Sequence, residues 1–152
     1  MESQVQGSGG KVMASRRLDA ASVARAFYES YNQKDLDASF EKYIAKDVIN
    51  HALDDTQTRE GWLAGEKAGV SAFAHFSLTV FDQVAEGDKV ATRFQAGGKH
   101  TGEFAGIPAS GNVAFLHSTA IDRIEHNQIV EQWADFDLHG WLEKLSASPT
   151  SK

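Results

Sequence analysis

The chain has 152 residues, 41% of them hydrophobic, and its 15 Lys plus Arg stand against 21 Asp plus Glu, giving a formal net charge of −6. A domain of this length can bury a full core, and its acidic balance argues against nucleic acid as a partner, because phosphate neutralisation requires basic residues. The chain contains no cysteine, which excludes disulfides, thiolate nucleophiles and cysteine-ligated metals. Because it shows neither an apolar run of about 20 residues nor a secretory leader, we expect a cytoplasmic protein with no membrane partner.

Polar segments flank a single predicted domain. Residues 1–17 are rich in Gly and Ser and show no apolar periodicity, and residues 146–152 are similarly polar. Both segments are therefore predicted to be flexible tails. The domain between them is predicted to span residues 18–145.

The first half of this domain predicts three helices and one short strand. Asp19 can cap a first helix, whose apolar side chains recur every three or four residues, and Asp35 can cap a shorter second helix. The β-branched residues of segment 47–51 favour a short strand. A third helix is indicated from about residue 58 to 73, although three glycines lower its helix propensity.

The second half of the domain has the period of β-strands. After residue 73 the apolar residues recur mostly at two-residue spacing, which predicts four long antiparallel strands. Turn-forming residues interrupt this pattern at 87–88, 97–98, 106–111 and 126–127. A closing helix is predicted over 139–145. We therefore expect an α+β domain in which a curved antiparallel sheet wraps around about three N-terminal helices and leaves a pocket with an open mouth.

Several segments carry a family resemblance. The chain reads YNQKDLD at 31–37, DVINH at 47–51, AEGDKVA at 85–91, HTGEFAGIPASG at 100–111, IDRI at 121–124, IVEQW at 129–133 and DLHG at 137–140. In this order and spacing, the segments resemble the motifs of the SnoaL-like polyketide cyclases. That family belongs to the cone-shaped superfamily of nuclear transport factor two and ketosteroid isomerase. The resemblance covers residues 23–145.

The resemblance implies an activity and an assembly. It implies a cofactor-independent cyclase or isomerase that binds a polyketide-like or terpenoid-like ketone in an apolar cavity, takes a proton from carbon and returns one to oxygen. It also implies a homodimer formed through the outer face of the sheet. Because one fold hosts many functions, two alternatives stay open: a dehydratase or hydrolase, and a non-catalytic small-molecule-binding or dimerisation module.

Two aspartates near the end of the domain are the first catalytic candidates. The resemblance places the acid/base position of antibiotic-pathway cyclases at Ala134, which cannot exchange a proton. Asp137, or failing it Asp135, is therefore the candidate for the acid/base, and the aromatic residues around both would raise the carboxyl pKa. Strand alternation, however, places Asp135 on the side of Trp133 and not of Ala134, and Asp137 can instead cap the closing helix.

Three histidines are further candidates. His51 ends the short strand in a segment that the family directs toward its cavity, and His117 interrupts an apolar strand. Either can orient a substrate oxygen or relay a proton, or simply be a hydrogen-bonded structural residue. His100, close to two glycines, is a candidate for the substrate-binding rim of the cavity or for a structural bend. The six histidines show no metal-ligand spacing, so no metal site is predicted.

Aromatic residues are the candidates for the pocket walls. The resemblance favours Tyr31 and Trp62, because they lie on helices that cover the pocket in this fold. Phe27 and Trp133 are further candidates for contact with a planar, mostly apolar ligand. The alternative for each is an ordinary core position, since core and cavity aromatics look alike in sequence.

Overall fold

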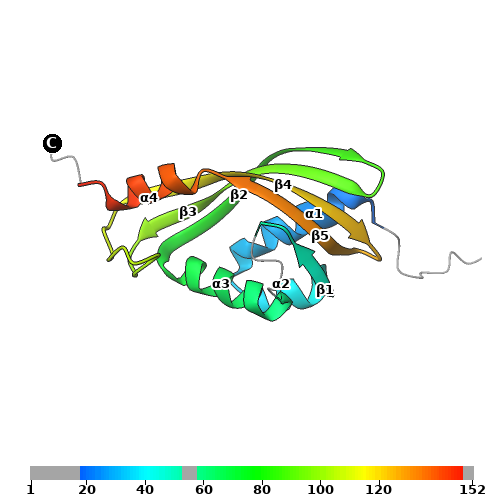
Figure 1. Ribbon diagram of the computed structural model, residues 1–152, viewed down its shortest axis with the longest axis horizontal. Coiled ribbons are helices and arrows are strands. Elements are labelled where there is room, and N and C mark those ends of the chain that lie inside the picture. The colour runs from blue at the N-terminus through cyan, green and yellow to red at the C-terminus, as the bar shows by residue number, and fades with distance from the viewer. Residues whose placement is uncertain (1–17, 53–57, 149–152) are drawn as a thin grey trace, which may run out of the picture.

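The computed structural model describes residues 18–52 and 58–148. The predicted tail at 1–17 and the last four residues of the other tail lie outside this part of the chain. The described residues form four α-helices, one 3-10 helix and five strands (Figure 1). In chain order these are α1 (Ala20–Ser30), η1 (Tyr31–Gln33), α2 (Leu36–Tyr43), β1 (Ile44–Asn50), α3 (Arg59–Ser71), β2 (Phe73–Glu86), β3 (Lys89–His100), β4 (Val113–Glu125), β5 (Gln128–Phe136) and α4 (Leu138–Ser146).

The first three α-helices all begin at capped positions, two of which, Asp19 and Asp35, the sequence predicts. Each begins behind a side chain that accepts a backbone N–H of its first turn: Asp19 for α1, Asp35 for α2 and Thr58 for α3. Such caps satisfy donors that a helix leaves unpaired, and each one stabilises its helix by about 1 kcal/mol. The prediction of three N-terminal helices is therefore confirmed. Helix α3 ends at Ser71, slightly before the predicted end at residue 73, and Phe73 is already the first residue of β2.

The sheet contains the four predicted antiparallel strands and one parallel edge strand. Its order is β1-β5-β4-β3-β2, and strands β2 to β5 pair antiparallel with their chain neighbours. The predicted short strand is β1, which pairs parallel with β5. The sheet is therefore mixed. Strand β1 pairs with the edge of β5 whose backbone groups are left free by the antiparallel strands. The backbone N–H of His51 extends this contact with a 2.8 Å hydrogen bond to the Gln132 carbonyl.

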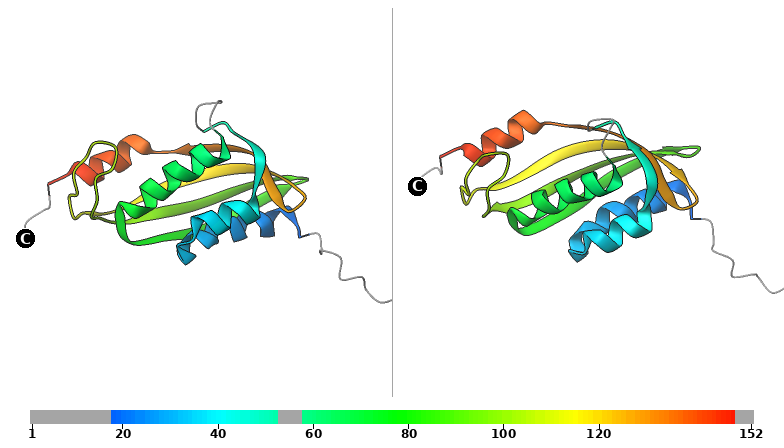
Figure 2. Two further views of the ribbon diagram at one scale, coloured as in Figure 1. Left: turned by 90° about the horizontal axis from the view of Figure 1, so that it is seen from below. Right: turned by 60° about the horizontal axis from the view of Figure 1, so that its bottom comes forward.

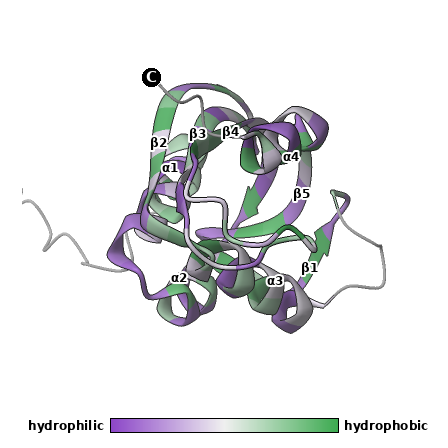
Figure 3. Cartoon of the chain, turned by 90° about the vertical axis from the view of Figure 1, so that its left-hand side faces the viewer, coloured by the Kyte–Doolittle hydropathy of each residue, from purple (hydrophilic) through white to green (hydrophobic). Residues whose placement is uncertain are grey.

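Helices cover one face of the curved sheet. Figure 2 shows α1 and α3 lying across the concave face, and Figure 3 shows strands β2 to β5 arching over them. The main core lies between these layers, and its largest fully buried side chains include Phe27, Phe40, Ile44 and Ile129. A smaller apolar cluster around Trp141 joins α4 to the far end of the sheet. No helix in the described part of the chain is long and apolar enough to cross a membrane.

Two glycines in β3 allow the strands to approach closely where the sheet bends. A Cβ atom on Gly97 would lie 2.1 Å from the Ala114 carbonyl oxygen, and one on Gly98 would lie 2.6 Å from the Ala74 carbonyl oxygen. Both distances are shorter than van der Waals contact, so only glycine fits at these positions. The pairing register of β2 with β3 shifts in the same region, between Ala74 and Ser77.

Candidate functional site

A cavity of about 330 Å³ lies between the concave face of the sheet and the helices. Most of its lining is apolar or aromatic, as in many small-molecule sites. Ala120 on β4 and Ala134 on β5 are paired residues on its sheet side. Phe136 and Leu138 line the cavity yet are 41% and 43% exposed, so they mark its mouth. Its polar lining residues are Tyr28, Tyr31, Asn50, Glu66, Ser118 and Gln132.

Three of the four aromatic residues predicted to bind a ligand line this cavity. They are Phe27 on α1, Tyr31 at the start of η1 and Trp62 on α3. The Phe27 ring lies in the middle, with its centroid 5.4 Å from Tyr31 and 6.1 Å from Trp62. The positions therefore suit ligand contact, and the contact itself stays a prediction.

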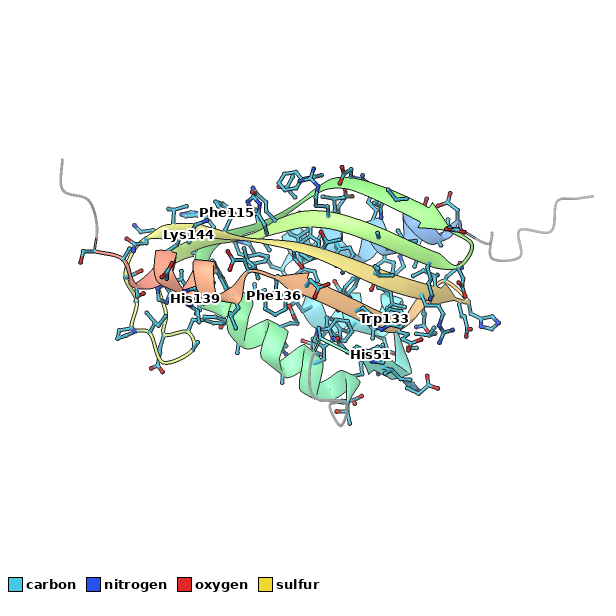
Figure 4. All side chains as sticks on the ribbon, turned by 45° about the horizontal axis from the view of Figure 1, so that its top comes forward. His51, Phe115, Trp133, Phe136, His139 and Lys144 are labelled. Atoms are coloured by element: carbon cyan, nitrogen blue, oxygen red, sulfur yellow. The ribbon has the colours of Figure 1, made fainter. Side chains whose placement is uncertain are left out.

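The fourth aromatic residue, Trp133, lies on the outer face of the sheet. Its neighbours Gln132 and Ala134 line the cavity, so strand alternation turns Trp133 away from it. There its ring stacks on His51, with centroids 4.9 Å apart (Figure 4). His51 Nε2 lies 2.7 Å from Glu131 Oε2, and this hydrogen bond is the main reason why the Glu131 pKa is lowered. The prediction that His51 and Trp133 belong to the cavity is wrong, because both belong to the opposite face.

The two candidate aspartates also lie outside the cavity. Asp135 is exposed, and it lies on the outer face because β5 pairs with β4 in regular register around it. Asp137 caps α4, since its Oδ1 accepts the Gly140 backbone N–H at 2.9 Å. Ala134, at the position that the resemblance gives to the acid/base, does line the cavity. The cavity wall therefore contains neither of the predicted carboxylates, and the capping alternative describes the geometry of Asp137.

His117 and His100 are not cavity residues either. His117 is exposed, because β4 turns it to the outer face while its neighbours Leu116 and Ser118 line the cavity. His100 is fully buried, stacks on Phe73 with centroids 5.5 Å apart and lies 3.0 Å from the Ser110 hydroxyl through Nδ1. His100 therefore connects β3 to the loop that follows this strand. This geometry corresponds to the structural role that was the alternative to the substrate-binding rim.

The carboxylate that does face the cavity is Glu66. It lies one helical turn after Trp62 on α3 and is half-buried. Its Oε2 accepts the Tyr31 hydroxyl at 3.0 Å, and its Oε1 accepts the Trp62 indole N–H at 3.2 Å. Removal from water raises the Glu66 pKa, and the two hydrogen bonds oppose that rise only in part. The sequence contained a signal for the inward position of Glu66, because Glu66 follows the predicted cavity residue Trp62 by four positions and residues four apart share one helix face.

A second carboxylate, Asp122 on β4, lies behind the cavity wall and is fully buried. Its Oδ2 accepts the Tyr28 hydroxyl at 2.5 Å, and its Oδ1 accepts an amide hydrogen of Gln132 at 2.8 Å. The same Gln132 nitrogen lies 3.1 Å from the Tyr28 hydroxyl oxygen. Burial raises the pKa of Asp122 to about 6, against the effect of these hydrogen bonds. The alternation of Ala120, Asp122 and Ile124 in sequence was the available signal for its inward position.

These groups give the cavity a defined chemical capacity. It contains a carboxylate held by neutral donors, with a pKa shifted toward neutral pH, in otherwise apolar surroundings. A half-buried carboxylate with a raised pKa beside an apolar ligand space is a candidate for general acid/base catalysis. Within residues 18–52 and 58–148, no three His, Asp or Glu side chains gather in a way that could hold a metal ion.

Comparison with known proteins identifies the family of the chain. The model of the SnoaL-like polyketide cyclase family matches residues 21–145. Among curated proteins there is no match to this chain.

Solved structures extend this finding. The chain is similar to IdmH, a candidate polyketide cyclase from Streptomyces antibioticus, with 31% identity and a TM-score of 0.74 over 86% of this chain and 100% of that chain. It is similar to TsrD from Streptomyces laurentii, with 28% identity and a TM-score of 0.75 over 86% of this chain and 98% of that chain. AclR from Streptomyces galilaeus, a candidate hydroxylase, shares the fold at 22% identity and a TM-score of 0.75 over 88% of this chain and 84% of that chain.

Proposed function

The chain belongs to the SnoaL-like polyketide cyclase family, and from this premise we propose that it cyclises or isomerises a polyketide-like or terpenoid-like ketone by proton transfer, with Glu66 as the acid/base. The family supports a cyclase-type function on a small molecule. The observation that carries the specific proposal is the Glu66 carboxylate in the wall of an apolar cavity. This role replaces the one predicted for Asp137 and Asp135.

The proposed step is an enolisation. The Glu66 carboxylate takes a proton from the carbon beside the substrate carbonyl, and the electron pair of the broken C–H bond moves toward the carbonyl oxygen. If the enol carbon then bonds to a second carbonyl carbon, a ring closes and the oxygen of that second carbonyl takes the proton from Glu66. If the proton returns from Glu66 to another carbon, the substrate is isomerised. The reaction needs no cofactor, since only protons are transferred and either one C–C bond or one new C–H bond forms.

The surroundings of Glu66 support this role. Tyr31 and Trp62 each donate to a different carboxylate oxygen, so the carboxylate is held in one orientation toward the ligand space. The raised pKa makes Glu66 a stronger base than a carboxylate in water. Holding a flexible ketone in its reactive conformation supplies further rate, because intramolecular reactions have high effective molarities.

The test uses 2-tetralone, a bicyclic ketone with exchangeable hydrogens beside its carbonyl. NMR follows the replacement of these hydrogens by deuterium in D2O. We expect the wild-type protein to accelerate this exchange and Glu66→Gln, which keeps the side-chain shape, to lower the rate by about 100-fold or more. Asp135→Asn is the matched control on the outer face and should keep the wild-type rate. Full exchange by Glu66→Gln would remove Glu66 from the mechanism, and a wild-type rate equal to that of buffer would favour the non-catalytic binding module.

We also propose that two copies of the chain associate through the outer face of the sheet. This face exposes large apolar side chains, including Phe81 at 39% and Ile121 at 41%. Sedimentation of the wild-type protein and of Ile121→Glu tests the proposal. We expect a dimer that the substitution dissociates, and a wild-type monomer at micromolar concentration would contradict it.

A further inference from the structure

The cavity has a second polar region besides Glu66, formed by Tyr28, Gln132 and Asp122. Tyr28 and Gln132 line the cavity, whereas Asp122 lies behind them without access to solvent. The Tyr28 ring is fixed by stacking on Phe94, with centroids 4.7 Å apart. Tyr28 and Gln132 therefore bring two hydrogen-bonding side chains to the cavity wall, and a buried carboxyl group lies behind them.

The hydrogen bonds of this region depend on the protonation state of Asp122. When Asp122 is ionised, the Tyr28 hydroxyl hydrogen points to its Oδ2, and the hydrogens of the Gln132 amide point to Asp122 Oδ1 and to the Tyr28 oxygen. All three hydrogens then point to atoms within the set of Tyr28, Gln132 and Asp122. When Asp122 carries a proton, its own O–H can donate to the Tyr28 oxygen. The Tyr28 hydroxyl hydrogen is then free to point into the cavity.

We infer that Tyr28 donates a proton to the carbonyl oxygen of the substrate and that Asp122 resupplies Tyr28 with this proton. The inference rests on the proposed function and deepens it, because it gives the second proton transfer of the enolisation to named groups. Tyr28 is then a catalytic residue. Asp122 is a positioning and proton-storing residue that acts through Tyr28.

Each proton that moves in this step has a named donor and a named acceptor. The C–H bond beside the carbonyl breaks, and its proton forms an O–H bond on the Glu66 carboxylate. The carbonyl oxygen takes the hydroxyl proton of Tyr28, and the Tyr28 oxygen takes the proton of the Asp122 carboxylic acid. The products of the step are a neutral enol, a protonated Glu66 and an ionised Asp122, with Tyr28 unchanged. The substrate class is therefore a mostly apolar ketone whose oxygen reaches Tyr28 while its acidic carbon reaches Glu66.

The electrostatic surroundings of Asp122 agree with proton storage. The titratable groups that interact with its charge are Tyr28 and Tyr31, and Glu66 interacts with the same two tyrosines. Its neighbours in the adjacent strands are Val90 and Gln132, which carry no charge. Burial raises the Asp122 pKa to about 6, so the group holds its proton below that pH and loses it above.

The experiment measures the pH dependence of deuterium exchange on 2-tetralone. In the wild-type protein the rate should fall as the pH rises through about 6, because Asp122 loses its proton there. Tyr28→Phe should lower the rate by about 100-fold or more, and Asp122→Asn should remove the fall of the rate with pH. Tyr43→Phe, a tyrosine outside the cavity lining, and Asp135→Asn are the matched controls and should keep the wild-type rate and profile.

A binding measurement separates this inference from the proposed function. Calorimetric titration with 2-tetralone in phosphate and in imidazole buffer reports proton uptake, because the two buffers differ in ionisation heat. We expect the wild-type protein near pH 6.5 to take up part of a proton on binding, since a carbonyl at Tyr28 favours the protonated form of Asp122. Tyr28→Phe should abolish this uptake, and this variant decides the matter if Asp122→Asn does not fold.

The outcomes are distinct. If Glu66→Gln loses exchange while Tyr28→Phe keeps the wild-type rate and pH profile, the proton transfer through Tyr28 is wrong and the proposed function stands. If the wild-type protein shows no exchange, the proposed function is wrong. In that case, proton uptake in the wild type and its absence in Tyr28→Phe would still support the link between Tyr28 and Asp122, and equal uptake in both proteins would overturn it.

Discussion

The buried Asp122 carboxyl should make the wild-type protein less stable as the pH rises from about 4 to about 7. Folding raises its pKa from 3.8 to about 6, so in this range the folded state binds more protons than the unfolded state. The free energy of unfolding therefore falls with rising pH. At about 1.36 kcal/mol per pKa unit, the whole effect is about 3 kcal/mol, of which about 2 kcal/mol falls between pH 4.5 and pH 7.5.

The assay is urea unfolding, followed by tryptophan fluorescence, at several pH values. Other carboxylates contribute to the pH dependence of the wild-type protein, so the informative quantity is the difference in unfolding free energy between the wild type and Asp122→Asn. This difference should shift against the wild type by about 2 kcal/mol as the pH rises from 4.5 to 7.5. The exposed Asp135→Asn variant should show no such shift. A difference that stays constant with pH, or that changes with the opposite sign, would refute the argument that burial dominates at Asp122.

Substitutions at three further positions test the structural arguments. Asp137→Ala should destabilise the protein by about 1 kcal/mol through loss of the α4 cap, whereas Asp137→Asn should keep the urea midpoint; equal midpoints for both would contradict the cap. Gly98→Ala should lower the melting temperature, because the added Cβ would meet the Ala74 carbonyl oxygen at 2.6 Å; an unchanged melting curve would show that the strands can separate there. Phe27→Ala should cost about 3–5 kcal/mol in urea unfolding, and a loss under about 1 kcal/mol would mean that the site collapses around the smaller residue.

The parts of the fold that sequence could predict depend on local signals. Helix caps such as Asp19 and Asp35 act within one turn, and strand alternation is a two-residue pattern, so both are visible without tertiary structure. The same alternation correctly placed Asp135 with Trp133 and opposite Ala134. The parallel pairing of β1 with β5 was not predictable in this way, because it joins segments about 80 residues apart.

The site was harder to predict than the fold. Glu66 and Asp122 become special only where helix and sheet meet, since their pKa values depend on neighbours from other elements. His51 was misplaced because a motif gives a residue type and a position but not the direction of a side chain just beyond the end of an edge strand. The helical spacing from Trp62 contained the missing information on Glu66, and it becomes useful only once the cavity wall is known.

The paired alanines on the sheet side of the cavity have a consequence for the shape of the ligand. Ala120 and Ala134 project only a methyl group each from adjacent strands, so the cavity floor between them carries no bulky side chain. A flat fused-ring skeleton can lie flush on such a floor. A branched or puckered skeleton would touch it at few points and forfeit dispersion contacts. The small side chains of Ala120 and Ala134 therefore favour a planar ligand.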